Sequence, residues 1–166
     1  MNLYQKNNLD CSRITTQNYS TSFSLGVRLF SPKYREGIYS IYGFVRYADE
    51  IVDTFFDQDQ LTIFEEFKQE TFKAIERKFS LNPILDSFQM AVHQYGIDHE
   101  LIEAFLKSME MDLSHKDYSP ELLKTYIYGS AEVVGLMCLR VFYPDDRDKY
   151  EQLVFLPVNW GRLFRK

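Results

Sequence analysis

The pattern of apolar and polar positions predicts helices through most of the chain. Apolar residues recur at three- and four-residue spacing, and runs that alternate apolar and polar residues are few. Helix starts are marked by Ser-Pro and Asn-Pro pairs, because serine and asparagine cap helices and proline suits the first turn. The expected helices cover about residues 32–55, 60–79, 83–95, 98–115, 120–142 and 145–156. Their short connections favour antiparallel packing, so we expect an all-α, single-domain protein over residues 1–166.

The composition agrees with a folded domain that has a substantial core. Hydrophobic residues make up 45% of the chain and charged residues 26%, which separates it from disordered sequences. The net charge of −5 provides no field that neutralises phosphates along a nucleic acid, so we expect no nucleic-acid partner. The high aromatic content of 16% either fills the core or lines an apolar ligand cavity, and the core is the favoured interpretation.

The cysteines and the first residues bear on the compartment. Cys11 and Cys138 are the only cysteines, too few for a disulfide framework or a zinc site, and a reducing compartment is expected. The N-terminal residues lack the apolar core of a signal peptide, and no unbroken apolar run approaches the roughly 18 residues that span a bilayer. We therefore expect a cytoplasmic protein, and contact with a membrane surface is compatible with the sequence.

The segment YADEIVD sets three carboxylates inside one of the expected helices. Helical residues three and four apart lie on one face. One stripe thus contains Tyr42, Arg46, Asp49 and Asp53. Glu50 is expected to point elsewhere. Carboxylates at this spacing can hold Mg²⁺ together with substrate phosphates, and Arg46 can neutralise the same phosphates. The alternative is a solvated ion pair between Arg46 and Asp49.

Two longer stretches carry a family resemblance. SFSLGVRLFSPKYREGIYSIYGFVRYADEIVD resembles the opening of the squalene and phytoene synthase family, with its Ser-x-Ser-Phe start and its Tyr-x-x-x-Arg-x-x-Asp-(Asp/Glu)-x-x-Asp helix. SMEMDLSHKDYSPELLKTYIYGSAEVVGLMCLRVF is similar to the family's middle section, where a Met-x-x-Asp helix precedes a Tyr-x-Tyr-Gly…Val-Gly helix. The resemblance covers about residues 15–153, and residues 154–166 form a divergent tail. The motif sequences are most similar to those of bacterial phytoene synthases.

This resemblance implies part of an all-α isoprenoid-synthase bundle around a deep apolar cavity. It also implies a Mg²⁺-dependent transferase that joins two prenyl diphosphates, which in phytoene synthases are geranylgeranyl diphosphates used for carotenoid biosynthesis. By the same resemblance, Asp49 and Asp53 would bind Mg²⁺ and Arg46 would bind the diphosphate. Tyr42 and Tyr128 would lie beside the reacting groups.

The resemblance assigns Ser20, Ser22 and Phe23 to the segment that touches the substrate diphosphate. The serine hydroxyl groups could donate hydrogen bonds there. The alternative for both serines is helix capping.

Three positions depart from the family pattern. Tyr19 stands where many relatives carry histidine, and Thr21 stands where some carry lysine, which weakens the case for diphosphate binding by this segment. Glu132 stands where the family has glycine, one turn after Tyr128. We expect this carboxyl group near the cavity, either kept protonated by burial or paired with a base.

The family's second Asp-rich motif is missing, because no Asp or Glu follows Glu151. One acidic wall cannot assemble the family's cluster of divalent ions and diphosphates, so we expect the chain alone to be inactive. Helices without their partners would expose apolar faces and favour self-association. The alternative function is that of a non-enzymatic assembly or interaction protein with the same fold.

Overall fold

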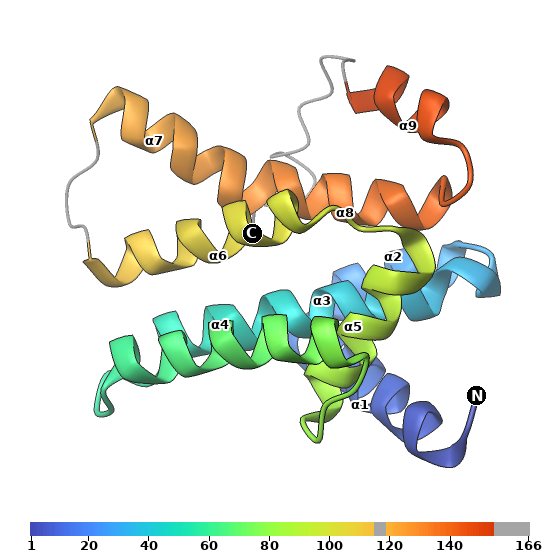
Figure 1. Cartoon of the computed structure of the whole chain (residues 1–166), viewed down its shortest axis with the longest axis horizontal. Coiled ribbons are helices and arrows are strands. Elements are labelled where there is room, and N and C mark those ends of the chain that lie inside the picture. Colours follow the sequence, from blue (N-terminus) through green and yellow to red (C-terminus); the bar gives the residue numbers. More distant parts are fainter. Residues whose placement is uncertain (115–118, 155–166) are drawn as a thin grey trace.

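The computed structural model describes residues 1–114 and 119–154, and its regular elements are helices (Figure 1). The all-α prediction is therefore confirmed for the described part of the chain. In chain order, the elements are α1 (Leu3–Tyr19), α2 (Thr21–Leu29), α3 (Pro32–Asp53), α4 (Gln60–Arg77), α5 (Pro83–Tyr95), α6 (His99–Ser114), α7 (Pro120–Ile127), η1 (Tyr128–Glu132), α8 (Val133–Phe142) and α9 (Arg147–Val154). The predicted tail over residues 154–166 lies, beyond its first residue, outside the described residues.

The proline signals locate the helix starts correctly. Pro32, Pro83 and Pro120 are the first residues of α3, α5 and α7. The side chains of Asn82 and Ser119 accept hydrogen bonds from backbone N–H groups of the first turns of α5 and α7. The ends are less well predicted, because α3 and α4 each stop two residues before the expected boundary. At the end of α4, the left-handed conformation of Lys78 (φ 55°) breaks the helix.

The two N-terminal helices are absent from the expected elements, and for α1 its buried face explains why. This face is polar and consists of Asn8, Ser12 and Thr16, spaced four residues apart. Apolar periodicity cannot detect such a helix. Ser12 Oγ lies 2.5 Å from Ser87 Oγ on α5. A Cβ atom at Gly43 of α3 would lie 2.8 Å from Ser12 Oγ, so glycine allows α1 to approach α3 closely.

The core forms around α3, which contacts α1, α2, α4, α5, α6 and α8. Phe44 of α3 is fully buried, and its ring stacks on Phe88 of α5 with centroids 3.9 Å apart. It also contacts Phe67 of α4 and Phe105 of α6, at 5.8 and 5.4 Å. This aromatic cluster joins four helices, so at least these aromatic residues serve the core.

The helix widens between α7 and α8 into the single π-helical turn η1. The backbone N–H of Val133 donates to the carbonyl oxygen of Tyr128, five residues earlier. Gly129 lies against α6, because a Cβ atom there would be 2.5 Å from the carbonyl oxygen of Ala104. The single helix that the sequence predicts in this region is therefore continuous but not a regular α-helix.

One stretch of the described residues, Pro120–Phe142, is long and apolar enough to cross a membrane by length and composition alone. The sequence predicts no such segment, because polar residues interrupt the apolar run. In its most apolar window, 44% of the residues are buried inside the protein, and every residue of Val133–Val141 is buried. Packing of α8 in the bundle accounts for its apolar composition.

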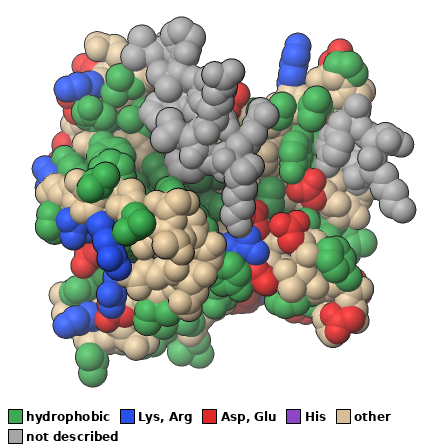
Figure 2. All heavy atoms as spheres, turned by 180° about the vertical axis from the view of Figure 1, so that it is seen from behind, with side chains coloured by type: hydrophobic (Ala, Val, Ile, Leu, Met, Phe, Trp, Pro, Cys, Tyr) green, Lys and Arg blue, Asp and Glu red, His purple; other side chains and the backbone are tan. Residues whose placement is uncertain are grey.

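Large hydrophobic side chains are also exposed on several helices. Among them, Leu3 and Leu29 are 84% and 87% exposed. On the face shown in Figure 2, the described hydrophobic side chains lie in several groups with charged and other polar atoms between them. Self-association through apolar faces stays a prediction.

Candidate functional site

The charged stripe predicted on α3 is present and centred on Arg46. Its Nη2 atom donates to Oε2 of Glu50 at 2.5 Å, and its Nη1 atom lies 3.9 Å from Oδ2 of Asp49. The Arg46 side chain is only 14% exposed, and its Nε atom is buried without a hydrogen-bond partner. Asp53 is the last residue of α3 and is exposed.

The prediction that Glu50 points elsewhere is wrong. Its carboxylate accepts a hydrogen bond from Arg46, and the hydroxyl groups of Tyr19 and Thr54 lie near it. The hydrogen bond from Arg46 lowers the pKa of Glu50 below its usual value. The four-residue spacing of Arg46 and Glu50 could have revealed this pair. Tyr19 could not be found in this way, because it lies at the end of a different helix.

Tyr19, the last residue of α1, covers the guanidinium group of Arg46. The Arg46 Cζ atom lies 4.5 Å from the centroid of the Tyr19 ring, which is cation–π geometry. Partial burial opposes the charge of Arg46, but the hydrogen bond to Glu50 and the carboxylate of Asp49 outweigh it and raise its pKa. Arg46 is thus a charged side chain held between an aromatic ring and carboxylates.

The corner between α1 and α2 lies on the same part of α3. The hydroxyl groups of Ser20 and Tyr42 lie near each other, and the Phe23 ring stacks on the Tyr42 ring with centroids 4.8 Å apart. Burial raises the pKa of Tyr42. Ser20 also accepts a hydrogen bond from the Phe23 backbone N–H, which confirms the capping alternative for Ser20. Ser22 is exposed. The structure therefore brings two of the three predicted corner residues to Tyr42.

The remaining candidates lie on other helices. Tyr128 begins the π-helical turn, is 43% exposed, and has no described contact with the α3 stripe. Tyr126, the first tyrosine of the Tyr-x-Tyr-Gly motif, donates a hydrogen bond from its hydroxyl group to Oδ2 of Asp112 at 3.0 Å. This bond connects α7 to α6. Glu132 is exposed, so burial, one of the two alternatives for this carboxyl group, is wrong.

Asp49 and Asp53 offer hard oxygen ligands one helical turn apart on α3. Within residues 1–114 and 119–154, no group of three or more His, Cys, Asp or Glu side chains could hold a metal ion. Mg²⁺ usually takes one or two carboxylates together with water and phosphate oxygens. The pair therefore fits part of a magnesium site, and the remaining ligands would come from a bound phosphate group and water.

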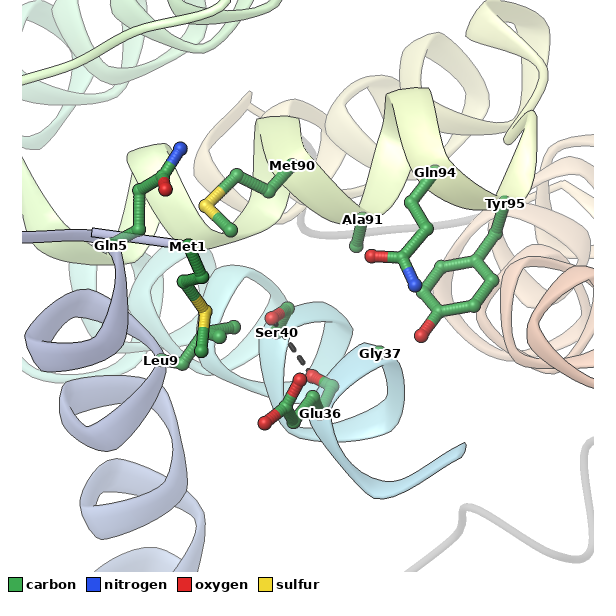
Figure 3. Close-up of a pocket in the computed structure, with 10 residues that line it drawn as sticks. All are labelled: Met1, Gln5, Leu9, Glu36, Gly37, Ser40, Met90, Ala91, Gln94 and Tyr95. Atoms are coloured by element: carbon green, nitrogen blue, oxygen red, sulfur yellow. Dashed lines mark hydrogen bonds between the residues drawn. The ribbon is translucent and has the colours of Figure 1, made fainter. Parts of the chain in front are cut away.

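A separate cavity of about 270 Å³ lies between α1, α3 and α5 (Figure 3). Glu36 and Ser40 line it from α3, and Gln94 and Tyr95 line it from α5. Glu36 precedes Asp49 by thirteen residues, which is about 20 Å along a helix. This cavity is therefore not part of the charged stripe.

Comparison with solved structures identifies the fold. The chain is similar to the crystal structure of a squalene synthase from Alicyclobacillus acidocaldarius, with a TM-score of 0.78 and 22% sequence identity. The similarity covers 93% of this chain and 58% of that one. The predicted isoprenoid-synthase helical fold is thus confirmed.

The sequence then identifies the family. Residues 16–154 match the squalene/phytoene synthase family, and the chain belongs to this family. It is 28% identical to a phytoene synthase of Arthrospira platensis over 153 residues, which cover 92% of this chain and 47% of that protein. It is 26% identical to a presqualene diphosphate synthase of Rhodopseudomonas palustris over 133 residues, which cover 79% of this chain and 47% of that protein. The chain spans about half the length of the curated relatives it matches.

Proposed function

We propose that this chain binds a prenyl diphosphate together with Mg²⁺ at Arg46, Asp49 and Asp53, as part of a phytoene synthase-like prenyltransferase. The observation that supports this most is the charged Arg46, 3.9 Å from Asp49, with Asp53 one helical turn beyond Asp49 on α3. The proposed substrate is geranylgeranyl diphosphate, and the proposed product of the complete reaction is phytoene, for carotenoid biosynthesis. The similarity to phytoene synthases supports this choice.

Each residue has a distinct proposed role. Arg46 attracts the diphosphate, and Asp49 and Asp53 hold Mg²⁺, which supplies positive charge that neutralises a departing diphosphate. Tyr42, stacked on Phe23, forms the wall beside them. Tyr128 remains a proposed catalytic residue by resemblance alone.

The test is a binding measurement on the purified chain. We expect the double variant Asp49→Asn/Asp53→Asn to weaken the Mg²⁺-dependent affinity for inorganic pyrophosphate by about ten-fold or more, because each amide is a poorer ligand for a hard cation than a carboxylate. Isothermal titration calorimetry with MgCl₂, and with EDTA in its place, measures this difference.

The matched control for this pair is Glu66→Gln/Glu70→Gln, which neutralises two exposed carboxylates at the same four-residue spacing on α4. It should bind as the unchanged chain does. Equal affinity of the Asp49/Asp53 variant and the unchanged chain would contradict the proposed site.

A second prediction concerns turnover. The 166 residues contain one Asp-rich motif of the two that the family's reaction uses, and metal ions contribute several kcal/mol to such reactions. With Mg²⁺ and geranylgeranyl diphosphate, we therefore expect the chain alone to form phytoene at about 1% or less of the rate of a full-length synthase. Phytoene extracted into solvent and quantified by its absorbance reports this, with the Arthrospira platensis enzyme assayed in parallel. Rates within ten-fold of each other would refute the prediction.

The alternative is an assembly or interaction protein of the same fold. It is favoured by the presence of only one of the family's two Asp-rich motifs in these 166 residues. The Asp49→Asn/Asp53→Asn variant separates the two functions, because partner binding should survive it and Mg²⁺-dependent diphosphate binding should not.

A further inference from the structure

Three side chains surround the guanidinium group of Arg46. The Tyr19 ring covers one face of the guanidinium group, Glu50 bonds to Nη2, and Nη1 faces Asp49. The Tyr19 hydroxyl group also lies near the Glu50 carboxylate. The ring and the carboxylate therefore form one unit around the guanidinium group, and this unit joins the end of α1 to α3.

An arginine side chain has many rotamers, and fixing it costs free energy when a ligand must do so. A guanidinium group that is already fixed loses less freedom on binding. Here the ring and Glu50 restrict the side chain before any ligand arrives, and they leave the Nη1 edge directed toward Asp49. This edge is therefore the one presented to a diphosphate that shares a cation with Asp49 and Asp53.

We infer that Tyr19 and Glu50 are positioning residues, which hold the guanidinium group of Arg46 so that its Nη1 edge meets the diphosphate. This inference rests on the proposed function. It assigns Glu50 a task different from that of the two aspartates, since its carboxylate is already bonded to Arg46. It also assigns Tyr19 an indirect role, because a neutral phenol supplies no positive charge to an anion.

The test compares side-chain variants by calorimetric titration with inorganic pyrophosphate and MgCl₂. We expect Tyr19→Leu to weaken binding by about five-fold, because it removes both the ring and the hydroxyl group. Tyr19→Phe keeps the ring and should weaken binding by only about two-fold. The matched control is Tyr47→Leu, which removes a similarly exposed tyrosine from α3 and should bind as the unchanged chain does.

Glu50→Gln tests the carboxylate. Removal of a negative charge by itself favours an anion, whereas loss of the charge-assisted hydrogen bond to Arg46 disfavours it. The inference predicts weaker binding of pyrophosphate. Tighter binding would overturn it and would show that Glu50 competes with the diphosphate for Arg46.

A nuclear magnetic resonance measurement separates positioning from general damage. The Nε–H signal of Arg46, identified by its loss in Arg46→Lys, should be observable in the unchanged chain and should shift with pyrophosphate and Mg²⁺. In Tyr19→Leu it should broaden through exchange, while the thermal unfolding midpoint stays within about 3 °C. A sharp, unshifted signal and unchanged affinity in Tyr19→Leu would refute the inference alone. Failure of the unchanged chain to bind pyrophosphate would refute the proposed function and this inference with it.

Discussion

Replacing Phe44 by alanine is expected to lower the free energy of unfolding by about 3–5 kcal/mol. The Phe44 ring is fully buried and lies against rings from α4, α5 and α6. Its removal would leave a cavity where four helices meet, and the rigid helices around it could close this cavity only in part.

Chemical denaturation followed by circular dichroism measures this loss. The control is Phe56→Ala, which removes a phenylalanine ring that is 76% exposed and should cost less than about 0.5 kcal/mol. Phe44→Leu keeps part of the buried volume and should fall between the two, so the prediction can be tested even if Phe44→Ala fails to fold. A loss below 1 kcal/mol for Phe44→Ala would contradict the central place of the aromatic cluster.

Replacing Asp86 by alanine is expected to cost about 3 kcal/mol, because it would strand buried hydrogen-bond donors. The Asp86 carboxylate is 2% exposed on α5. It accepts hydrogen bonds from Nδ2 of Asn8 at 2.9 Å, from the backbone N–H of Ser80 at 2.9 Å and from Nε2 of Gln89 at 3.3 Å. Alanine would leave these donors without an acceptor and would weaken the packing of α1 on α5.

The same denaturation experiment tests this prediction, with Asp10→Ala as the control. Asp10 lies on α1 and pairs with Arg13 at the surface, so its loss should cost less than about 0.5 kcal/mol. The double variant Asn8→Ala/Asp86→Ala should cost less than the sum of the two single variants, since it removes donor and acceptor together. Equal costs for Asp86→Ala and Asp10→Ala would show that the buried carboxylate does not fasten α1.

Local signals in the sequence were enough to predict most helices. Ser-Pro and Asn-Pro pairs fix a helix start through the conformation of adjacent residues, and the starts of α3, α5 and α7 follow them. The first helix escaped prediction because its buried face is polar. Such a face becomes visible only when Asp86 and Ser87 of α5 are placed beside Asn8 and Ser12.

One part of the candidate site can be predicted from local sequence, and the other part depends on how the helices pack. The stripe of Arg46, Asp49 and Asp53 follows from the helical period within one segment and is predictable. The contacts of Tyr19 with Arg46, and of Ser20 with Tyr42, join residues more than twenty positions apart and depend on how α1 and α2 pack on α3. No local pattern encodes these contacts. The pairing of Glu50 with Arg46 also follows from the helical period, because the two residues are four positions apart. It is missed when only the stripe of Arg46, Asp49 and Asp53 is considered.

The π-helical turn at Tyr128–Glu132 bears on how this helix is aligned with its homologues. A turn closed over five residues contains one more residue than the corresponding α-helical turn, so it has the geometry of an α-helix with one residue added. Each residue advances an α-helix by about 100°, and removal of one residue here would rotate α7 by that angle relative to α8. Homologues without this added residue would therefore be one residue shorter between the tyrosine motif and the Val-Gly pair. Alignments that omit this gap would match residues about 100° apart around the helix.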